Sequence, residues 1–211
     1  SSAVQRGSTL ATIDSLVGSS NVDARFSLLV TAPLPLKHLS PVKLYIGTRR
    51  LACRLFYIEP VDGGQLNPGG SALVQLILAQ DIHCCAGDRF LIRDDSESIT
   101  LGGGVVLDPL APKTGKSREH RLIYLRAMEL GSPSLTLTAL LTPNSPPLNL
   151  SQLRKCWNIT AGELQLLLQG MLVQQFEVSA VPYAVSMDYW SGAQATLLTQ
   201  LQQWHTQNPQ D

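Results

Sequence analysis

The sequence predicts a mixed β and α protein, in which an antiparallel β-barrel is followed by a winged-helix module. Apolar residues alternate with period two over residues 25–107, which is typical of strands that bury one face. Turn residues interrupt this alternation, as they do in barrels and sandwiches. After Pro109 the apolar period lengthens to about 3.6 residues, the period of an α-helix. The fold class follows from this change of period.

At least four strands can be read in the first half, and a further strand is expected over 89–93. Residues two apart in a strand share a face, so each set of alternating apolar side chains should point into the barrel. The expected inward-facing sets are Phe26, Leu28 and Val30; Val42, Leu44 and Ile46; Leu51, Cys53, Leu55 and Tyr57; and Ala72, Val74, Leu76 and Leu78.

Three consecutive glycines, Gly102, Gly103 and Gly104, fall in the strand expected to close the barrel. Glycine inside a strand indicates a bulge or the close approach of another backbone. Leu107, Asp108 and Pro109 would then form the exit from the barrel.

The second half should begin with three helices. A helix over 117–130 would be capped by Ser117 and stopped by Gly131. Shorter helices are expected over 135–141 and 150–157.

The remaining elements complete the order helix, turn, helix, hairpin, which is that of a winged helix. Thr160 and Glu163 form a capping box, so a helix should start at residue 161. Strands are expected over 171–178 and 182–187. A second capping box beginning at Ser191 would open a final helix.

Composition excludes several classes of protein. The chain has 211 residues, 44% of them hydrophobic, and no apolar run approaches the roughly 20 residues that span a bilayer. We therefore expect a cytoplasmic monomer with no membrane partner. The 16 basic and 16 acidic residues give no net charge, so any nucleic-acid contact must be local.

No catalytic or metal site is expected within these residues. The four cysteines show neither metal-knuckle nor disulfide-ladder spacing, and reduced cytosolic thiols are the preferred interpretation. The four histidines lie far apart and show no ligand spacing. These residues are Cys53, Cys84, Cys85 and Cys156, and His38, His83, His120 and His205.

Gly115, Lys116 and Ser117 match the end of a nucleotide-binding phosphate loop, but the rest of that motif is absent. Leu110 stands where the loop needs its first glycine, and Pro112 removes a backbone donor. We expect no nucleotide cofactor here. The alternative, an ATPase, would reveal itself on titration with ATP or GTP.

Two local basic groups are candidates for contact with an RNA backbone, because arginine presents forked donors suited to phosphate. The alternatives are a solvated strand face for the first group and a flexible polar connection for the second. The groups are Arg49, Arg50 and Arg54 in the barrel, and Lys113, Lys116, Arg118 and Arg121 in the connection and first helix.

The expected recognition helix over 161–169 is unsuited to nucleic acid. It contains no Lys or Arg, and Glu163 places a negative charge at its leading end. We therefore predict that the winged-helix module is mainly a spacer. A winged-helix transcription regulator with an N-terminal effector-binding barrel is the alternative function.

Short ordered segments resemble the bacterial SelB family of selenocysteine-specific translation elongation factors. The barrel segments resemble the third, translation-factor domain of that family, including an Ala-Gly-Asp-Arg-Phe-Leu-Ile-Arg-Asp strand and a glycine-rich closing strand. The segments that carry the resemblance are 5–10, 36–39, 42–54, 86–94, 100–109, 113–130 and 204–209.

The resemblance implies a non-catalytic fragment of a factor that delivers selenocysteinyl-tRNA to the ribosome at recoded UGA codons. The GTPase domain, with its GTP and Mg²⁺, would lie upstream, and the mRNA insertion hairpin would be bound only by missing C-terminal modules. The barrel arginines would contact the tRNA backbone. The implied parts are 1–20, the tail of a preceding barrel; 21–109, the barrel; 110–190, the linker and winged-helix module; and 191–211, the first helix of a truncated second module.

Overall fold

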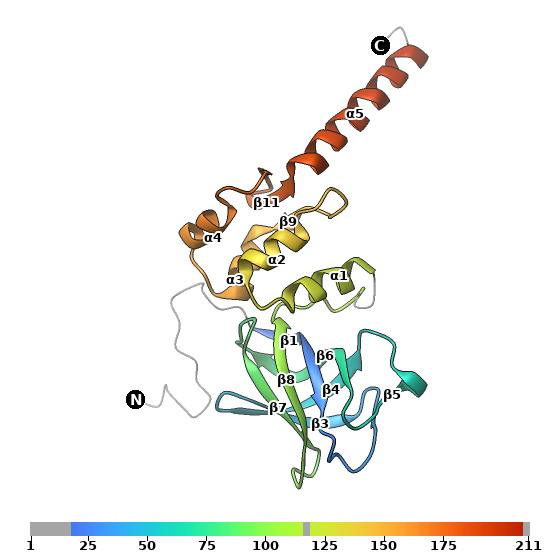
Figure 1. Cartoon of the computed structure of the whole chain (residues 1–211), viewed down its shortest axis with the longest axis vertical. Helices are drawn as coiled ribbons and strands as arrows, with labels where there is room; N and C mark the ends of the chain where they lie inside the picture. Colours follow the sequence, from blue (N-terminus) through green and yellow to red (C-terminus); the bar gives the residue numbers. More distant parts are fainter. Residues whose placement is uncertain (1–17, 116–118, 209–211) are drawn as a thin grey trace.

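The computed structural model describes residues 18–115 and 119–208. A closed barrel lies at one end, a helical module packs on it, and the last helix projects away from both (Figure 1). Residues 5–10, which carried part of the resemblance, and Lys116, Ser117 and Arg118 lie outside the described residues. The predicted helix cap at Ser117 is therefore also outside them.

The barrel is antiparallel and closed, with strand order β1-β6-β4-β3-β7-β8. A two-stranded sheet of β2 and β5 lies beside it, with a short helical turn, η1 (Asp62–Gly64), before β5. The strands are β1 (Ser19–Leu28), β2 (Leu36–Lys37), β3 (Pro41–Ile46), β4 (Arg49–Tyr57), β5 (Gln65–Leu66), β6 (Ser71–Ile82), β7 (Arg89–Asp94) and β8 (Thr100–Asp108).

The predicted inward faces form the barrel core, with one exception. The alternating apolar residues of β3, β4 and β6 are buried, as are Phe26 and Leu28 of β1. Val30 is 80% exposed, so its prediction was wrong. The reason is local, because β1 ends at Leu28 and the chain turns there, with the Ala32 amide donating to the Leu29 carbonyl at 3.0 Å. Strand β1 also includes Ser19 and Ser20, which the prediction assigned to the preceding segment.

The glycines of β8 let the barrel close. A Cβ atom on Gly104 would lie 2.0 Å from the backbone oxygen of Arg25, and one on Gly102 would lie 2.2 Å from that of Ser27. Both distances are far inside van der Waals contact, so only glycine fits between β1 and β7. The predicted close backbone approach is confirmed.

The helical module follows the predicted order, and its hairpin β10–β11 pairs with the short strand β9. Its small core contains Leu137, Leu153 and Leu164. The Thr160–Glu163 capping box is present, with the Glu163 amide donating to the Thr160 hydroxyl at 3.2 Å. The elements are α1 (Glu119–Met128), α2 (Pro133–Leu140), β9 (Leu148–Asn149), α3 (Leu150–Trp157), α4 (Ala161–Leu168), β10 (Val173–Val178) and β11 (Val181–Ser186).

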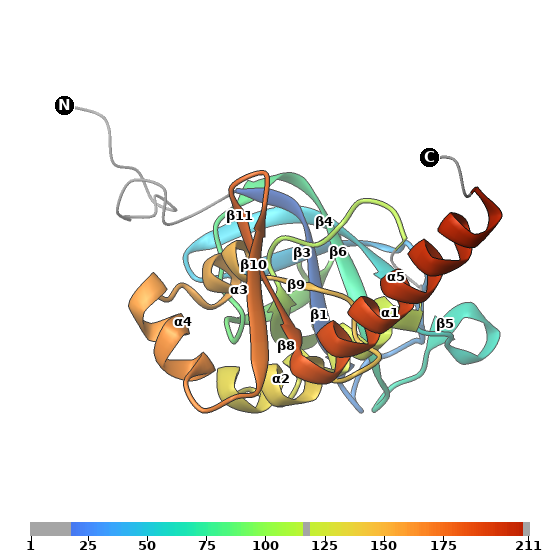
Figure 2. The ribbon, with the colours of Figure 1, turned by 90° about the horizontal axis from the view of Figure 1, so that it is seen from above.

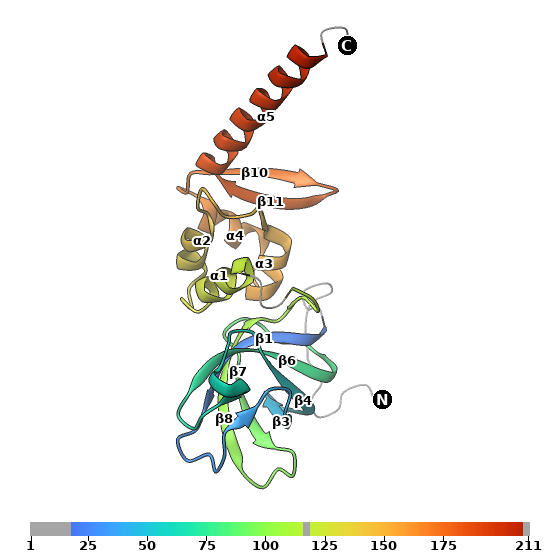
Figure 3. The ribbon, with the colours of Figure 1, turned by 90° about the vertical axis from the view of Figure 1, so that its right-hand side faces the viewer.

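The final helix, α5 (Met187–Gln207), begins earlier than predicted. The Ser186 hydroxyl accepts the Tyr189 amide at 3.1 Å and caps the helix, so Ser191 lies inside it rather than at its start. The predicted second capping box was therefore wrong, and strand β11 ends at Ser186. The hairpin lies between the rest of the module and α5 (Figure 3), and α4 and α5 extend to opposite sides (Figure 2).

Helix α1 joins the module to the barrel along a contact that we call the seam. Apolar side chains from the outer barrel surface meet the buried side of α1 there. The buried members are Ile58, Leu73 and Leu107 from the barrel, and Leu125 and Met128 from α1. The module therefore covers the outer face of β1, β6 and β8 (Figure 1). It leaves the outer face of β3, β4 and β7 open, except at Phe56 near the end of β4, which packs against the seam.

Candidate nucleic-acid interface

The open outer face of β3, β4 and β7 carries a group of cations around one aromatic ring. On β3, Val42, Leu44 and Ile46 point inward, so the intervening residues point outward. Register places Tyr45 opposite Arg50, and Lys43 opposite Arg93. We call this group the basic face; it comprises Lys43, Tyr45, Arg50, Arg54 and Arg93.

Acidic residues from the β7–β8 loop neutralise part of the basic face. Lys43 Nζ lies 3.0 Å from Asp95, and Arg50 Nη1 lies 3.1 Å from Glu97. The Tyr45 hydroxyl also donates to Glu97. This hydrogen bond and the Arg50 charge lower the pKa of Glu97. Because these groups are exposed, the pairs orient the side chains more than they stabilise the fold.

Of the remaining two cations, Arg54 keeps its donors free for a ligand. The Arg54 guanidinium is exposed and forms no ion pair or hydrogen bond with another described residue. The guanidinium carbon of Arg93 lies 6.0 Å from the centre of the Tyr45 ring. Its Nε is buried and has no partner within residues 18–115 and 119–208, so this atom is not presented to a ligand. Four cations against two acids leave a local excess of positive charge on a neutral chain. An anionic polymer would find both charge and forked donors here.

The structure separates Arg49 from the other two predicted barrel arginines. Arg49 lies opposite the inward-facing Ile46, whereas Arg50 and Arg54 lie on the outward side of β4. Its Nη1 donates to the backbone oxygen of Asp81 at 3.1 Å. Arg49 therefore does not belong to the basic face, because strand alternation turns neighbouring side chains to opposite sides.

Of the second predicted basic group, Lys113 is exposed in the segment between β8 and α1, on the seam side of the barrel. Arg121 is buried, with 9% of its side chain exposed, and it pairs with Asp23 and Asp108, which are fully buried. Its predicted role as an RNA contact is corrected, because its donors are committed inside the protein. The sequence around Arg121 does not reveal this pairing, because both carboxylates belong to strands of the barrel.

The outer surface of α4 carries no basic side chain. Glu163 closes its first turn, and the exposed residues that follow include Gln165 and Leu166. The basic residues Arg154 and Lys155 lie on the preceding helix and are half-buried. A nucleic-acid recognition helix needs basic or amide side chains at its start. The module thus presents fewer basic side chains to a phosphate backbone than the barrel does.

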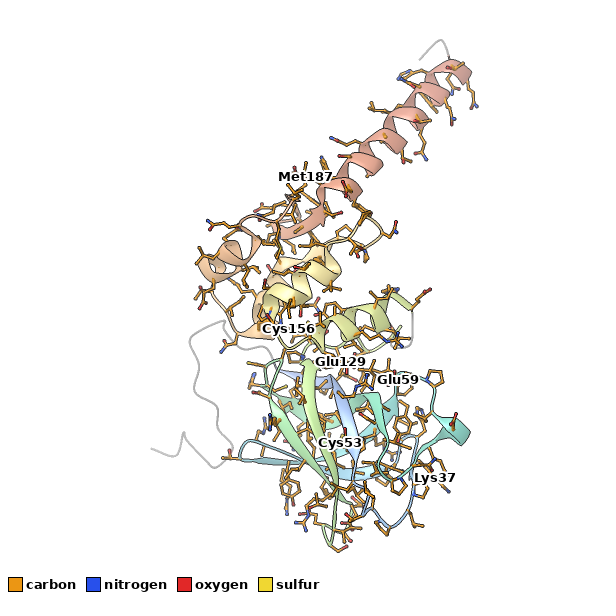
Figure 4. All side chains as sticks on the ribbon, viewed as in Figure 1. Lys37, Cys53, Glu59, Glu129, Cys156 and Met187 are labelled. Carbon is orange, nitrogen blue, oxygen red and sulfur yellow. The ribbon has the colours of Figure 1, made fainter. Side chains whose placement is uncertain are left out.

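Within the described part of the chain, no three His, Cys, Asp or Glu side chains are grouped so that they could hold a metal ion. No described helix is long and apolar enough to cross a membrane. Cys53 is buried in the barrel core (Figure 4), and burial raises the pKa of its thiol to about 12. Such a thiol is a poor nucleophile.

Sequence reasoning missed Lys43, Tyr45 and Arg93 as members of the basic face. A signal was present for Lys43 and Tyr45, since they alternate with the predicted inward residues of β3. For Arg93 only the strand was predicted, without its inward face. Alternation shows that a side chain points outward, but it does not show which strands are neighbours. The register of β3 with β4 and β7 supplies that information.

Comparison with known proteins shows which protein family the barrel resembles. Residues 23–113 match the family described as the β-barrel domain of the selenocysteine-specific elongation factor. The match spans the barrel and ends before α1. The resemblance predicted from the sequence is thereby confirmed.

Relatives of the SelB-type barrel extend the similarity into the helical module. The selenocysteine-specific elongation factor of Desulfomicrobium baculatum is 27% identical over 213 residues, which cover 98% of this chain and 32% of the relative. That of Haemophilus influenzae is 27% identical over 106 residues, which cover 50% of this chain and 17% of the relative. The chain thus spans about a third or less of the length of these curated relatives.

Proposed function

We propose that this chain is part of a selenocysteine-specific elongation factor that delivers selenocysteinyl-tRNA to the ribosome at recoded UGA codons. In this proposal the basic face contacts the tRNA backbone, and the helical module acts as a spacer. The barrel family and the names of the relatives support the translation role. The chain itself performs no catalysis. GTP and Mg²⁺ would act in another domain, and the mRNA insertion hairpin would be bound by further modules.

The observation that carries the RNA contact is the exposed and only partly neutralised charge of the basic face. The Arg50 side chain is 65% exposed, and Arg54 has no ionic partner among the described residues. Phosphate contacts of this kind fix the position of an RNA without reading its sequence. The basic face therefore fits a backbone contact, with Tyr45 supplying an aromatic edge beside it.

Equilibrium binding of selenocysteinyl-tRNA by the full-length factor tests the RNA contact. The double substitution Arg50→Ala with Arg54→Ala should weaken binding and reduce the slope of log affinity against log salt by about 1 to 2, because each lost phosphate contact removes roughly one released counterion. Arg126→Ala is the matched control, since Arg126 is an exposed arginine on the helical module. Unchanged affinity and slope in the double variant would contradict the assignment.

The spacer role of the helical module has its own test. Arg154 and Lys155 are the basic residues of α3, the helix that precedes α4 in the module. Substituting both by alanine in the full-length factor should leave tRNA affinity and its salt slope unchanged. A loss comparable with that of the Arg50 and Arg54 double variant would show that the module binds RNA.

A further inference from the structure

The most unusual feature outside the basic face is a buried charge cluster at the seam. Arg121 of α1 reaches two barrel carboxylates, with its Nη2 lying 2.5 Å from Asp23 Oδ2 and 2.8 Å from Asp108 Oδ2. Its Nε also donates to Asp23 Oδ2 at 2.9 Å. Asp23 lies on β1 and Asp108 ends β8, so one side chain of the module ties two strands of the barrel.

Neutral groups satisfy the second oxygen of each carboxylate. Gln75 Nε2 donates to Asp23 Oδ1 at 2.7 Å. The Leu110 amide donates to Asp108 Oδ1 at 2.8 Å, and the Cys156 thiol lies 3.3 Å from the same oxygen. The cluster thus joins side chains of β1, β6, β8, α1 and α3. Tyr124, whose ring stacks 4.9 Å from the Arg121 guanidinium, covers it.

A second arginine also bridges the seam, but it belongs to the barrel and reaches an acid of the module. Arg25 of β1 donates to both oxygens of Glu129, just after α1, at 2.5 and 2.9 Å, and to Glu59 at 2.7 Å. Glu59 and Glu129 lie near the boundary between barrel and module, and so does Cys156 (Figure 4). The backbone also crosses the boundary, where the Ala86 amide donates to the Cys156 carbonyl at 2.8 Å. Polar contacts therefore join the barrel and the module in addition to the apolar part of the seam.

The two kinds of contact constrain the seam differently. Apolar packing between Leu125 and Leu73 is non-directional, so it tolerates small rotations of the module. A guanidinium held by two carboxylates has fixed directions, and a shift would strand a buried charge without its partner. The buried cluster therefore selects one arrangement among those that apolar contact would allow.

We propose that Arg121 is a positioning residue, which fixes the direction of the helical module relative to the barrel and makes the two one rigid body. The proposal rests on contacts within the chain and does not depend on RNA binding by the basic face. It gives the spacer a defined direction relative to the barrel.

Distance measurement between spin labels in the full chain tests the proposal. Ala52 on β4 and Ala139 on α2 are exposed and can each be changed to cysteine for labelling. Cys85, which is half-buried, would be changed to serine. The other native thiols are buried. The parent and the control Arg126→Met should give one narrow distance distribution, whereas Arg121→Met should give a broadened or shifted one.

A second variant covers the case in which Arg121→Met does not fold. Combining Arg121→Met with Asp23→Asn and Asp108→Asn removes all three charges and keeps the amide oxygens that accept from Gln75 and Leu110. Hydrogen exchange of the barrel strands, measured alongside, reports whether each half stays folded. A broad or shifted distribution in a folded triple variant supports the proposal. A distribution as narrow as that of the parent overturns it, because apolar packing alone would then fix the module.

Discussion

Two outer faces of the same barrel carry polar residues that end in opposite environments. On β1 and β6, Asp23 and Gln75 are fully buried beneath α1. On β3 and β4, Lys43 and Arg50 face outward, and 65% of the Arg50 side chain is exposed. The covered face is bound to the helical module by buried paired charges. On the open face, Lys43 and Arg50 form exposed ion pairs, and Arg54 has no ionic partner among the described residues.

The difference teaches that the energetic role of a charge depends on burial more than on residue type. A buried charge that loses its partner retains a large desolvation cost, whereas an exposed ion pair contributes little because water replaces it. Burial lowers the pKa of Arg121, but Asp108 and Asp23 more than offset this effect, so the pKa is raised and the side chain stays charged. Four substitutions sharpen the comparison, from the covered face to the open one.

Arg121→Met should have the largest effect. It strands two buried carboxylates, and removing one partner of such a cluster costs about 3 to 5 kcal/mol. Urea unfolding at pH 7 measures the loss. Arg126→Met, on the exposed side of the same helix, should stay within about 0.5 kcal/mol of the parent. Equal effects of the two substitutions would show that the seam cluster does not stabilise the fold.

Asp23→Asn should change how stability depends on pH. Burial raises the pKa of Asp23 from 3.8 to about 6, against the opposing effects of Arg121 and Gln75. Between these values the folded state binds more protons at Asp23 than the unfolded state, so this group makes stability fall as pH rises from about 4 to 6 and then level off. The parent should therefore lose about 2 kcal/mol across this window relative to the variant.

Unfolding of both proteins at several pH values between 3.5 and 7.5, chosen to bracket roughly this window, provides the measurement. Subtracting one profile from the other removes the titration of groups that both proteins share. Parallel profiles would mean that Asp23 does not take up a proton in the folded state over this range.

Glu129→Gln should fall between the two extremes. The bridge from Arg25 to Glu129 is partly exposed, with side chains 28% and 27% accessible. Water screens it, so losing the charge should cost about 1 kcal/mol or less. Thermal or urea unfolding in low and high salt checks this value, since the difference should shrink as salt increases. A loss of stability as large as that of Arg121→Met would show that this bridge stabilises the fold as much as the buried cluster does.

Arg54→Ala should have the smallest effect on stability. Its guanidinium has no ionic partner among the described residues, so the free energy of unfolding should change by less than about 0.5 kcal/mol. The same variant should weaken tRNA binding in the full-length factor, which separates a binding role from a structural one. A large stability loss would instead indicate that Arg54 stabilises the barrel.

Elements with a strong local signal were predictable. The Thr160–Glu163 capping box and the helix over 150–157 are present as predicted, because each depends on neighbouring residues. Ser191 shows the limit of such signals. The local pattern at Ser191 predicts a helix start, but Ser186 already caps the same helix five residues earlier, so Ser191 lies inside it. Val30 failed for a related reason, because its alternation continued past the turn that ends β1.

The candidate site was only partly predictable. Arg50 and Arg54 could be placed together because they share one strand and one face. Their neighbours on β3 and β7 could not, since strand order and register in a closed barrel depend on contacts distant in sequence. The basic residue Arg121 was assigned to RNA for the same reason, because its carboxylate partners lie 98 and 13 positions away.

The sequence by itself determined the periods, the capping box at Thr160 and the glycines that let β8 pass between β1 and β7. These properties are set by neighbours within a few residues or by the absence of a side chain. Only the tertiary structure decided which polar face of the barrel is covered and which remains open. The packing of α1 on β1, β6 and β8 makes this choice. It buries one set of charges in an ion-paired cluster inside the protein, and it leaves the basic face exposed to solvent.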